Sequence, residues 1–458
     1  MKFNSSGTRP PSVAKLPNRQ KVTLLSVSAV LVMLALFLGS CASWLEPLLN
    51  GEPVGVTTPT SSPTVEANPG EPTLTPEPVD PIQGVVTIPI WLPPQFNPEG
   101  GTPAGDVLRA RLDAFMEENP GVLLVTRVKA ASGPGGMLES LTAASAAAPD
   151  SVPALVALSR SDLEAAALKG LILPLDGLTA VAENADWYAY ARELGRVQNS
   201  TFGLPFVGDA LVLIYRPPAE GQSSHASWTD IFAANEVVIF PANDSQALVT
   251  LALYRSAGGL LQDLQGRPAL DPEFFQQVLQ NYKDGIGRGA FPNWLAQVQT
   301  PGQAWQAFIE KQGDWVVTWS SNYLSDLPPD ANAALLPSLG SDPVTLATGW
   351  SWSLTDTDPL RRETTVQLME FLSDSAFLAN LTSSAGYLPT RPTALAAWPN
   401  QSLQPVISQV VLAAEVRPAN ELLASLGPVL RDAVLSVFNG EADPAQAAAT
   451  AAERLGSP

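Results

Sequence analysis

Residues 153–170, PALVALSRSDLEAAALKG, place a short apolar strand directly before a helix. The run 153–159 is apolar and of strand length, as a buried strand requires. Ser161, with Glu164 three positions later, forms a capping box that predicts the helix start, and Gly170 predicts its end. A strand that leads straight into a helix is the repeating unit of α/β folds.

The same unit recurs on both sides of this segment. Strands are predicted at 85–91, 122–128, 153–159, 201–217, 315–319 and 348–355. Helices are predicted at 104–121, at 136–148, through most of 228–312, and from Asp358 onward, where Pro359 takes the first helical position. This alternation predicts an α/β fold whose parallel sheet carries helices on both faces.

The amino-terminal segment predicts export. Residues 1–21 carry five basic residues and no acid, and the uncharged apolar run 22–40 ends at Cys41. A basic flank, an apolar core and a small-residue exit are typical of a secretory signal. The ending Leu-Gly-Ser-Cys resembles the lipobox of bacterial lipoprotein precursors, which implies that 1–40 is a cleaved signal peptide and that Cys41 is lipidated. An uncleaved membrane helix is the alternative, and both interpretations place the rest of the chain outside the cytoplasm.

Composition separates a stalk from the folded region. Residues 41–83 are rich in Pro, Thr, Ser, Gly and Glu, and we expect a disordered, extended stalk. About 375 residues follow, more than one hydrophobic core accommodates, so two domains are expected. Residues 1–40 hold five of the 25 basic residues and none of the 44 acidic ones, so the chain from Cys41 on has a formal net charge of −24. This acidity argues against nucleic acid as a partner.

Several segments together carry a resemblance to a known family. They are 115–122 (FMEENPGV), 147–158 (AAPDSVPALVAL), 168–176 (LKGLILPLD), 202–216 (FGLPFVGDALVLIYR), 227–232 (SWTDIF), 308–319 (FIEKQGDWVVTW), 348–355 (TGWSWSLT), 386–395 (GYLPTRPTAL) and 430–455. In this order the chain resembles the family 1 extracellular solute-binding proteins of ABC importers, the maltose-binding-protein-like group. The resemblance covers about residues 84–455.

The resemblance implies a two-lobed periplasmic-binding-protein-like α/β fold, with a hinge and a ligand cleft between the lobes. The first lobe would comprise 84–208 and 353–396, and the second 217–347 and 397–458. The hinge crossings would fall at 209–216, at 348–352 and near residue 396. Pockets commonly form at such domain interfaces.

The resemblance also suggests which residues line the cleft. Aromatic side chains can cover the apolar faces of a sugar, while polar groups bind its hydroxyls. The aromatic candidates are Trp91, Trp319, Tyr323, Trp350, Trp352 and Tyr387, and the polar candidates are Arg160, Asp209 and Arg391. The alternative is a core position for each aromatic residue and a surface salt bridge for each polar one.

Two of these candidates are preferred, and one departure from the family limits the choice of ligand. Asp209 is the preferred hydrogen-bonding residue because it lies at a predicted strand end, and Trp350 is the preferred aromatic contact. Where the maltose-binding protein has a second sugar-stacking pair, this chain has Leu426 and Gly427. This difference argues against a maltodextrin-like ligand.

The sequence holds no catalytic or metal-binding motif. His225 is the only histidine, and neither a G-x-S-x-G elbow nor an H-E-x-x-H motif occurs. No catalytic residue, metal or cofactor is therefore expected, with a carboxylate-pair glycosidase as a remote alternative. We expect a monomer, lipid-anchored to the cell membrane and facing outside the cytoplasm, that captures a small solute, a carbohydrate, for an ABC importer. The alternative is a ligand-sensing or adhesive surface lipoprotein of the same fold.

Overall fold

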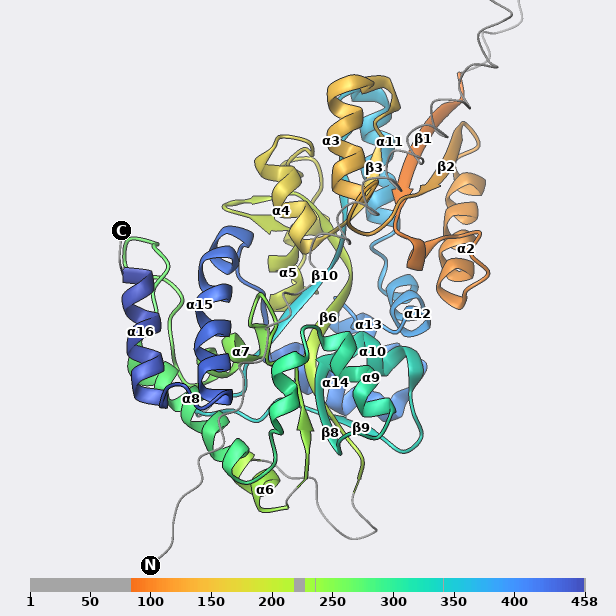
Figure 1. The fold of residues 1–458 in the computed structure, drawn as a ribbon. Helices are drawn as coiled ribbons and strands as arrows, with labels where there is room; N and C mark the ends of the chain where they lie inside the picture. Colours follow the sequence, from red (N-terminus) through yellow and green to blue (C-terminus); the bar gives the residue numbers. More distant parts are fainter. Residues whose placement is uncertain (1–83, 218–226, 235, 341, 457–458) are drawn as a thin grey trace, which may run out of the picture. The chain divides into compact units, whose positions relative to one another are not determined.

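The computed structural model describes residues 84–217, 227–234, 236–340 and 342–456 (Figure 1). The predicted signal segment, Cys41, the stalk and His225 lie outside these residues. These described residues belong to one compact unit. Within the described ranges, no helix combines the length and the apolar composition that crossing a membrane requires.

One large sheet runs through this unit. The strands are β1 (Val86–Leu92), β2 (Val122–Val128), β3 (Leu155–Ser159), β4 (Arg196–Val197), β5 (Ser200–Thr201), β6 (Leu204–Tyr215), β7 (Val238–Ile239), β8 (Trp315–Trp319), β9 (Asn332–Ala334), β10 (Thr345–Leu354) and β11 (Ala414–Val416). The sheet has the order β2-β1-β3-β10-β6-β8-β7, with β11 paired to β10 and β9 paired to β6. β4 and β5 pair with each other outside this sheet.

Helices follow most of the strands. They are α2 (Pro103–Glu118), α3 (Met137–Ala147), α4 (Arg160–Leu168), α5 (Ala189–Leu194), α6 (Trp228–Ala233), α7 (Leu248–Ser256), α8 (Pro272–Gly287), α9 (Pro301–Ile309), α10 (Ser320–Asp326), α11 (Pro359–Phe371), α12 (Ser375–Ala385), α13 (Pro392–Ala396), α14 (Gln404–Ala413), α15 (Asn420–Phe438) and α16 (Pro444–Gly456). The predicted α/β alternation is therefore present.

The strands do not all run in one direction. β1 is parallel to β2 and to β3, as predicted, but β10 runs antiparallel to both β3 and β6. The prediction of a parallel sheet is wrong for these strands, and the sheet is mixed. A continuous apolar run indicates a strand buried on both faces, but it does not indicate the direction of that strand.

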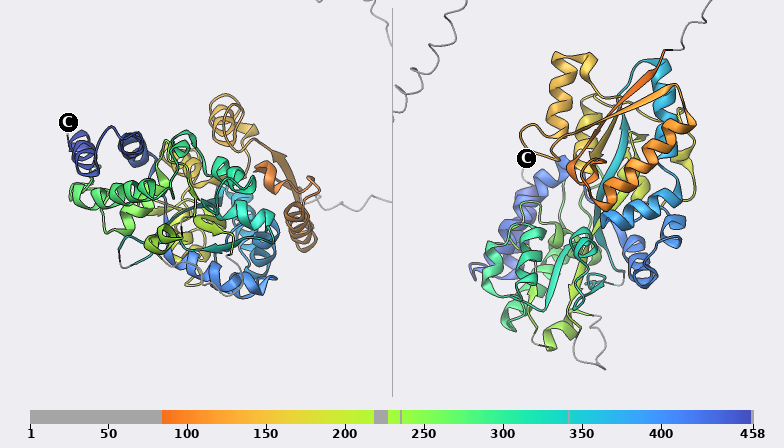
Figure 2. Two further views of the ribbon diagram at one scale, coloured as in Figure 1. Left: turned by 60° about the horizontal axis from the view of Figure 1, so that its bottom comes forward. Right: turned by 90° about the vertical axis from the view of Figure 1, so that its right-hand side faces the viewer.

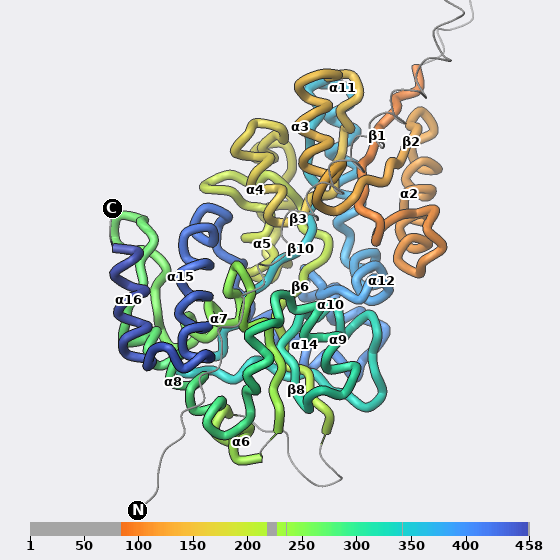
Figure 3. Tube along the Cα trace, viewed as in Figure 1, coloured from red at the N-terminus to blue at the C-terminus, as the bar shows by residue number. Residues whose placement is uncertain are grey.

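The two longest strands, β6 and β10, connect the two parts of the sheet. Residues 204–210 of β6 pair with β10, whereas residues 211–215 pair with β8. In the same way β10 pairs with β3 over residues 350–354 and with β11 over residues 345–347. Figure 3 shows both strands passing from the part that holds β1 to β3 into the part that holds β8.

Helices from distant parts of the sequence pack together on each part. α12 packs on α2, and α11 contacts β1, so late segments join the first strands (Figure 1). On the other part, α15 and α16 pack against α8, as both views of Figure 2 show. Leu108, Leu112 and Phe115 of α2 are buried at helical spacing, in the segment where the sequence predicted a helix.

The start of α4 differs from the prediction. The capping residue is Ser159, whose hydroxyl accepts a hydrogen bond from the Asp162 N–H at 3.3 Å, and the helix begins at Arg160. A cap at Ser161 is therefore wrong by two residues, because β3 leads into α4 without a loop. The Glu164 carboxylate, expected to complete a capping box, turns to another segment. At α11 the prediction is confirmed, with Asp358 as cap and Pro359 first.

Candidate functional site

The carboxyl ends of three strands bring polar residues together. α4 follows β3 directly, residues 240–247 follow β7, and residues 417–420 follow β11. Ligand sites of open α/β sheets lie at such strand ends. We use the name strand-end cluster for Arg160, Asp162, Glu164, Asp244, Arg417 and Asn420.

Asn420 joins two of these segments directly. Its backbone N–H donates to Glu164 Oε1 at 2.9 Å, and its Nδ2 donates to the carbonyl oxygen of Ser161 at 2.8 Å. Residues more than 250 positions apart are thus held together at the ends of β3 and β11.

Arg417 is a buried cation whose Nε has no hydrogen-bonded partner. The residue is only 8% exposed, yet its side chain makes no hydrogen bond and no ion pair with any described residue. Burial lowers the pKa of Arg417, and the negative charge of Glu164 opposes this shift. Leaving a buried ion unpaired is strongly unfavourable, so an acceptor brought from outside the chain would stabilise this position.

Arg160 is likewise a buried cation with N–H groups that lack an acceptor. Its side chain is 11% exposed, and its closest ion pair joins Nη2 to Glu164 Oε2 at 3.9 Å. Nε and Nη1 of Arg160 are buried without a hydrogen-bond partner. Burial lowers the pKa of Arg160 as well, against the charge of Glu164. The cluster therefore holds two guanidinium groups with N–H donors to spare.

Two of the three carboxylates in the cluster, those of Asp244 and Glu164, accept hydrogen bonds from backbone N–H groups. Asp244 Oδ1 accepts from the backbone N–H of Gln246, and Oδ2 accepts from that of Leu248, both at 3.0 Å. Glu164 Oε1 accepts from the N–H of Asn420. Burial raises the pKa of Asp244, and these backbone hydrogen bonds lower it. The carboxylates give the cluster negative charge, but they supply no close oxygen to the guanidinium groups.

Two pockets border the cluster, and Arg160 lines both. The first, of about 370 Å³, is also lined by Tyr190, Glu193 and Arg417. The second, of about 490 Å³, is also lined by Glu164 and Asn420. Pockets that hold small ligands range from about 300 to 1,000 Å³, so either is large enough for a small solute.

Asp209 lies in the middle of β6, so the prediction that it stands at a strand end is wrong, because the strand continues to Tyr215 and changes its partner from β10 to β8. The Asp209 carboxylate binds the start of α10. Its Oδ1 accepts from Ser320 Oγ at 2.7 Å and from the Ser321 N–H at 2.9 Å, and its Oδ2 accepts from Ser321 Oγ at 2.6 Å. Burial raises the pKa of Asp209 to about 6, although these hydrogen bonds oppose the shift. In this conformation the carboxylate is occupied by the chain itself.

Trp350 and Tyr387 lie near Asp209. The Phe96 ring is 6.1 Å from the Trp350 ring and 5.7 Å from the Tyr387 ring, centroid to centroid. Tyr387 directly precedes Leu388, whose backbone exchanges hydrogen bonds with that of Gly208 on β6. Burial raises the pKa of Tyr387, and the charge of Asp209 adds to that shift. The structure thus groups three of the predicted residues, and Trp350 and Tyr387 are partly exposed.

Three other predicted aromatics are buried among apolar side chains. Trp352 is completely buried and stacks on Phe206 at 4.4 Å. Trp91 is 3% exposed and belongs to the apolar cluster around Met137. Tyr323 is 6% exposed, and its hydroxyl donates to the Ala331 carbonyl. In this conformation these side chains offer little surface to a ligand, which is the core alternative considered for them.

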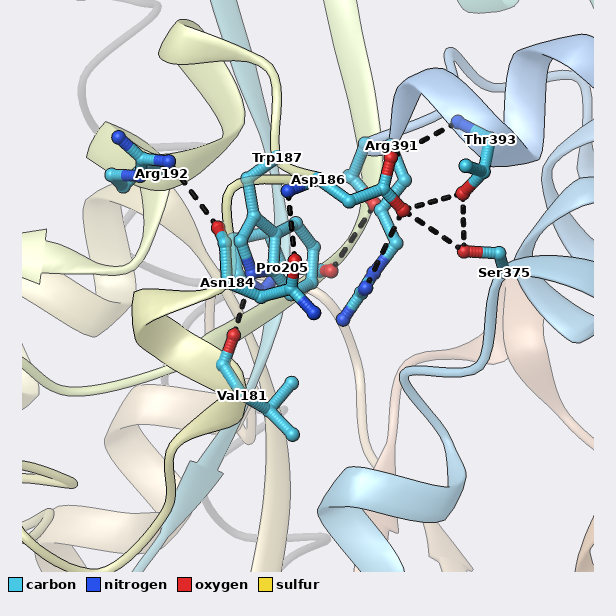
Figure 4. Close-up of polar contacts among 10 residues, drawn as sticks. Val181, Asn184, Asp186, Trp187, Arg192, Pro205, Ser375, Arg391 and Thr393 are labelled. Atoms are coloured by element: carbon cyan, nitrogen blue, oxygen red, sulfur yellow. Dashed lines mark hydrogen bonds and ion pairs between the residues drawn. The ribbon is translucent and has the colours of Figure 1, made fainter.

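Arg391 belongs to a separate polar group, shown in Figure 4. Its guanidinium lies 3.9 Å from the centroid of the Trp187 ring and pairs with Asp186 at 3.6 Å. Asp186 also accepts hydrogen bonds from Ser375 and from Thr393. These contacts tie the start of α12 and α13 to the segment before α5, so Arg391 stabilises the fold at this point.

Trp319 and Arg160 remain at strand ends, as predicted. Trp319 is the last residue of β8, is partly exposed, and pairs with Leu211 two residues beyond Asp209. Arg160 follows β3, where Ser159 pairs with Trp350. Arg160, Asp209, Trp319 and Trp350 therefore lie on or next to neighbouring strands, and Tyr387 precedes Leu388, which bridges to β6. The side chains of Trp91, Trp352, Tyr323 and Arg391 are buried in other surroundings.

Sequence reasoning missed Arg417, Asn420 and Asp244. Arg417 stands between two helical stretches in AEVRPAN, where a single basic residue before a proline resembles any exposed loop. Arg417 is nevertheless buried in the folded protein. Among the described residues, no group of three or more His, Cys, Asp or Glu side chains is arranged to hold a metal ion.

Comparison with known proteins gives a family and a fold. A family model described as bacterial extracellular solute-binding protein matches residues 110–404. Comparison with curated proteins finds no match. Three similar solved structures are the cyclic alpha-maltosyl-1,6-maltose binding protein from Arthrobacter globiformis, the maltose-bound MalE3 of T. maritima and the sugar-binding protein MalE of Xanthomonas citri.

The likeness to these structures extends over their whole length. The Arthrobacter protein is 16% identical with a TM-score of 0.67, over 81% of this chain and 98% of its own. The T. maritima protein is 17% identical with a TM-score of 0.63, over 81% and 99%. The Xanthomonas protein is 18% identical with a TM-score of 0.64, over 81% and 96%.

These comparisons confirm two expectations. The two-lobed α/β fold is the fold of the similar structures, and the matched family consists of substrate-binding proteins rather than enzymes. The family match spans well over half of the sequence. The chain therefore belongs to the bacterial extracellular solute-binding proteins.

Proposed function

We propose that this protein captures a small carbohydrate at the strand-end cluster and delivers it to the membrane subunits of an ABC importer. One observation carries the proposal: guanidinium groups with unused N–H donors lie beside pockets of ligand size at strand ends. Similar structures bound to maltose or described as binding maltose-based sugars support a carbohydrate as the solute.

The chemistry of the surroundings suits a hydroxylated ligand. Sugar hydroxyl and ring oxygens accept hydrogen bonds, and Arg160 and Arg417 have buried donors without partners. Trp319, Trp350 and Tyr387 are all partly exposed and remain available to cover an apolar ring face. Polar groups fix the orientation of a ligand, while apolar and aromatic groups supply most of its contact.

We further propose that the protein works as a two-lobed clamp. The lobes would be 84–208 with 353–396 and 217–347 with 397–458, and the strands β6 and β10 that link the two parts of the sheet would form the hinge. A ligand that touches both lobes favours the closed state by its higher affinity for that state. The strand-end cluster draws on both proposed lobes, through Arg160 and through Arg417.

A lipid anchor at Cys41 would keep this clamp, acting as a monomer, near its importer outside the cytoplasm. The test is metabolic labelling with an alkyne fatty acid in a bacterial host, comparing the full chain with Cys41→Ser. We expect the label and the membrane association to disappear in the variant. Equal labelling of both proteins would rule out the anchor.

The binding proposal is tested by a thermal-shift screen of the purified protein against sugars, polyols, amino acids and phosphoesters. A ligand that binds the native state at 100 times its Kd stabilises that state by about 2.7 kcal/mol, which raises the unfolding midpoint. We expect at least one sugar to do so. A shift with an amino acid or a phosphoester alone would contradict the carbohydrate assignment.

A further inference from the structure

We infer that the solute carries a carboxylate that binds between Arg160 and Arg417, so that the ligand is an acidic sugar such as a hexuronate. This inference rests on the proposed function, namely that the strand-end cluster binds a carbohydrate. It adds the chemical class of that carbohydrate and names the two residues that select it.

Two buried cations of the cluster have N–H groups that lack hydrogen-bonded partners. Arg417 is 8% exposed and the side chain of Arg160 is 11% exposed. The Nε atoms of both residues and Nη1 of Arg160 are enclosed without an acceptor. A chain that keeps such groups in its interior gives up stability. A bound anion would restore the missing hydrogen bonds and offset the burial of the charges.

The two guanidinium groups line the same pocket from different segments of the chain. Arg160 begins α4 and Arg417 follows β11, and both line the pocket of about 370 Å³. They are close enough for the charge of Arg160 to disfavour that of Arg417. Glu193 and Glu415 line the same pocket, but neither forms an ion pair with Arg160 or Arg417, so an anion lying between the two guanidinium groups would be the closer partner. A carboxylate fits because guanidinium groups bind its oxygens in a planar, two-pronged geometry.

Within the described part of the chain, the carboxylates of the protein itself form no hydrogen bond with either guanidinium group. Asp244 and Glu164 lower the cost of burying the arginines at a distance, but their close hydrogen bonds go to backbone N–H groups. The closest carboxylate oxygen to either guanidinium is that of Glu164, at 3.9 Å. A neutral sugar could also accept hydrogen bonds here, yet it would bring no negative charge closer to the arginines than the 3.9 Å between Arg160 and Glu164. The site should therefore prefer the acidic member of a matched pair.

The test compares sugars that differ only at carbon 6. The full chain, purified in detergent, is titrated calorimetrically with galacturonate and galactose, glucuronate and glucose, and the corresponding acidic and neutral disaccharides. We expect at least one acidic sugar to bind ten times more tightly than its neutral counterpart, or better. Arg417→Met and Arg160→Met should each abolish this preference.

Controls separate binding from folding. Arg431 lies on the same helix as the cluster's Asn420, but it pairs with Asp432 at 2.8 Å. The control variant Arg431→Met should therefore leave the preference unchanged. Arg417→Met should not lower the unfolding midpoint of the free protein, since it removes an unpaired buried charge. A merely structural Arg417 would give the opposite result, a clear loss of thermal stability.

Three results would overturn the inference, and they differ in what they imply for the proposed function. Equal or tighter binding of the neutral sugars overturns the acidic-sugar inference and leaves the proposed function intact. A preference for the acid that survives both arginine substitutions also overturns the inference. Failure of every sugar, acidic or neutral, overturns the proposed function and this inference with it.

Discussion

At the scale of the residue, Asp209 couples the β6–α10 junction to pH. The carboxylate is enclosed, and burial raises its pKa from 3.8 to about 6 in the folded protein. The folded state therefore binds more protons than the unfolded state between about pH 4 and pH 6. Stability contributed by the protonated form is complete below pH 4 and is lost as the pH rises through 6.

Replacing Asp209 by Asn should remove this dependence. Two pK units correspond to about 3 kcal/mol, so the unfolding free energy of the natural protein should fall by up to that amount relative to Asp209→Asn between pH 4 and pH 7. Urea denaturation at several pH values measures the difference, with Asp113→Asn at an exposed position of α2 as the matched control. A difference that stays constant with pH would show that Asp209 does not titrate in this window.

The burial of a single residue was harder to predict from the sequence than its place in a motif. Asp209 and Trp350 were identifiable because they occupy motifs of the family that the sequence resembles. Arg417 was not, because its unusual property is burial without a partner, and burial depends on which distant segments close over it. Trp352 illustrates the same limit, since alternation places it beside Trp350 on the strand but does not reveal that Phe206 covers its ring.

At the scale of the element, α15 is held closely against the segment that follows β7. A Cβ atom at Gly427 would lie 2.4 Å from the Ser245 carbonyl oxygen and 3.0 Å from Gln246 Cα, both of which are backbone atoms. The helix can approach so closely only because position 427 has no side chain. Gly427, which occupies the place of a sugar-stacking residue in the related protein, thus serves packing next to the strand-end cluster.

Gly427→Ala should therefore destabilise the protein despite the better helix propensity of alanine. Alanine favours a helix interior by about 1 kcal/mol over glycine, but overpacking of a tight contact costs typically 1–3 kcal/mol. We expect a net loss of up to about 2 kcal/mol in chemical denaturation. Gly287→Ala at the end of α8, where no atom lies within 4 Å of the added Cβ, is the control and should not destabilise. Equal effects of the two substitutions would contradict the close contact.

Most elements were predictable from their sequence patterns, but their ends and directions were not. The 104–121 helix followed from apolar spacing and its stop signal, and the start of α11 followed from Asp358 and Pro359. The start of α4 was displaced, because Ser159 and Ser161 are equivalent as caps until the end of β3 is known. The antiparallel direction of β10 depends on how the chain returns to the sheet, which local patterns do not contain.

At the scale of the whole molecule, Asn420 links segments that belong to the two proposed lobes. It contributes one hydrogen bond from its backbone and one from its side chain to α4. If the lobes move as a clamp, these bonds form when the clamp closes and contribute to the free energy of closure. The equilibrium between open and closed states then depends on them as well as on the ligand.

Asn420→Ala tests this coupling by removing the bond to the Ser161 carbonyl while keeping the backbone bond to Glu164. A hydrogen bond contributes about 0.5–1.5 kcal/mol, so the affinity for the sugar found by screening should fall by up to about tenfold. Small-angle X-ray scattering should show a larger radius of gyration for the free variant than for the free natural protein. Asn439→Ala is the control, because Asn439 Nδ2 binds Glu441 within its own segment and spans no proposed lobe boundary. Unchanged affinity together with unchanged scattering would mean that contact between α4 and α15 does not govern closure, and the clamp would have to close around other residues.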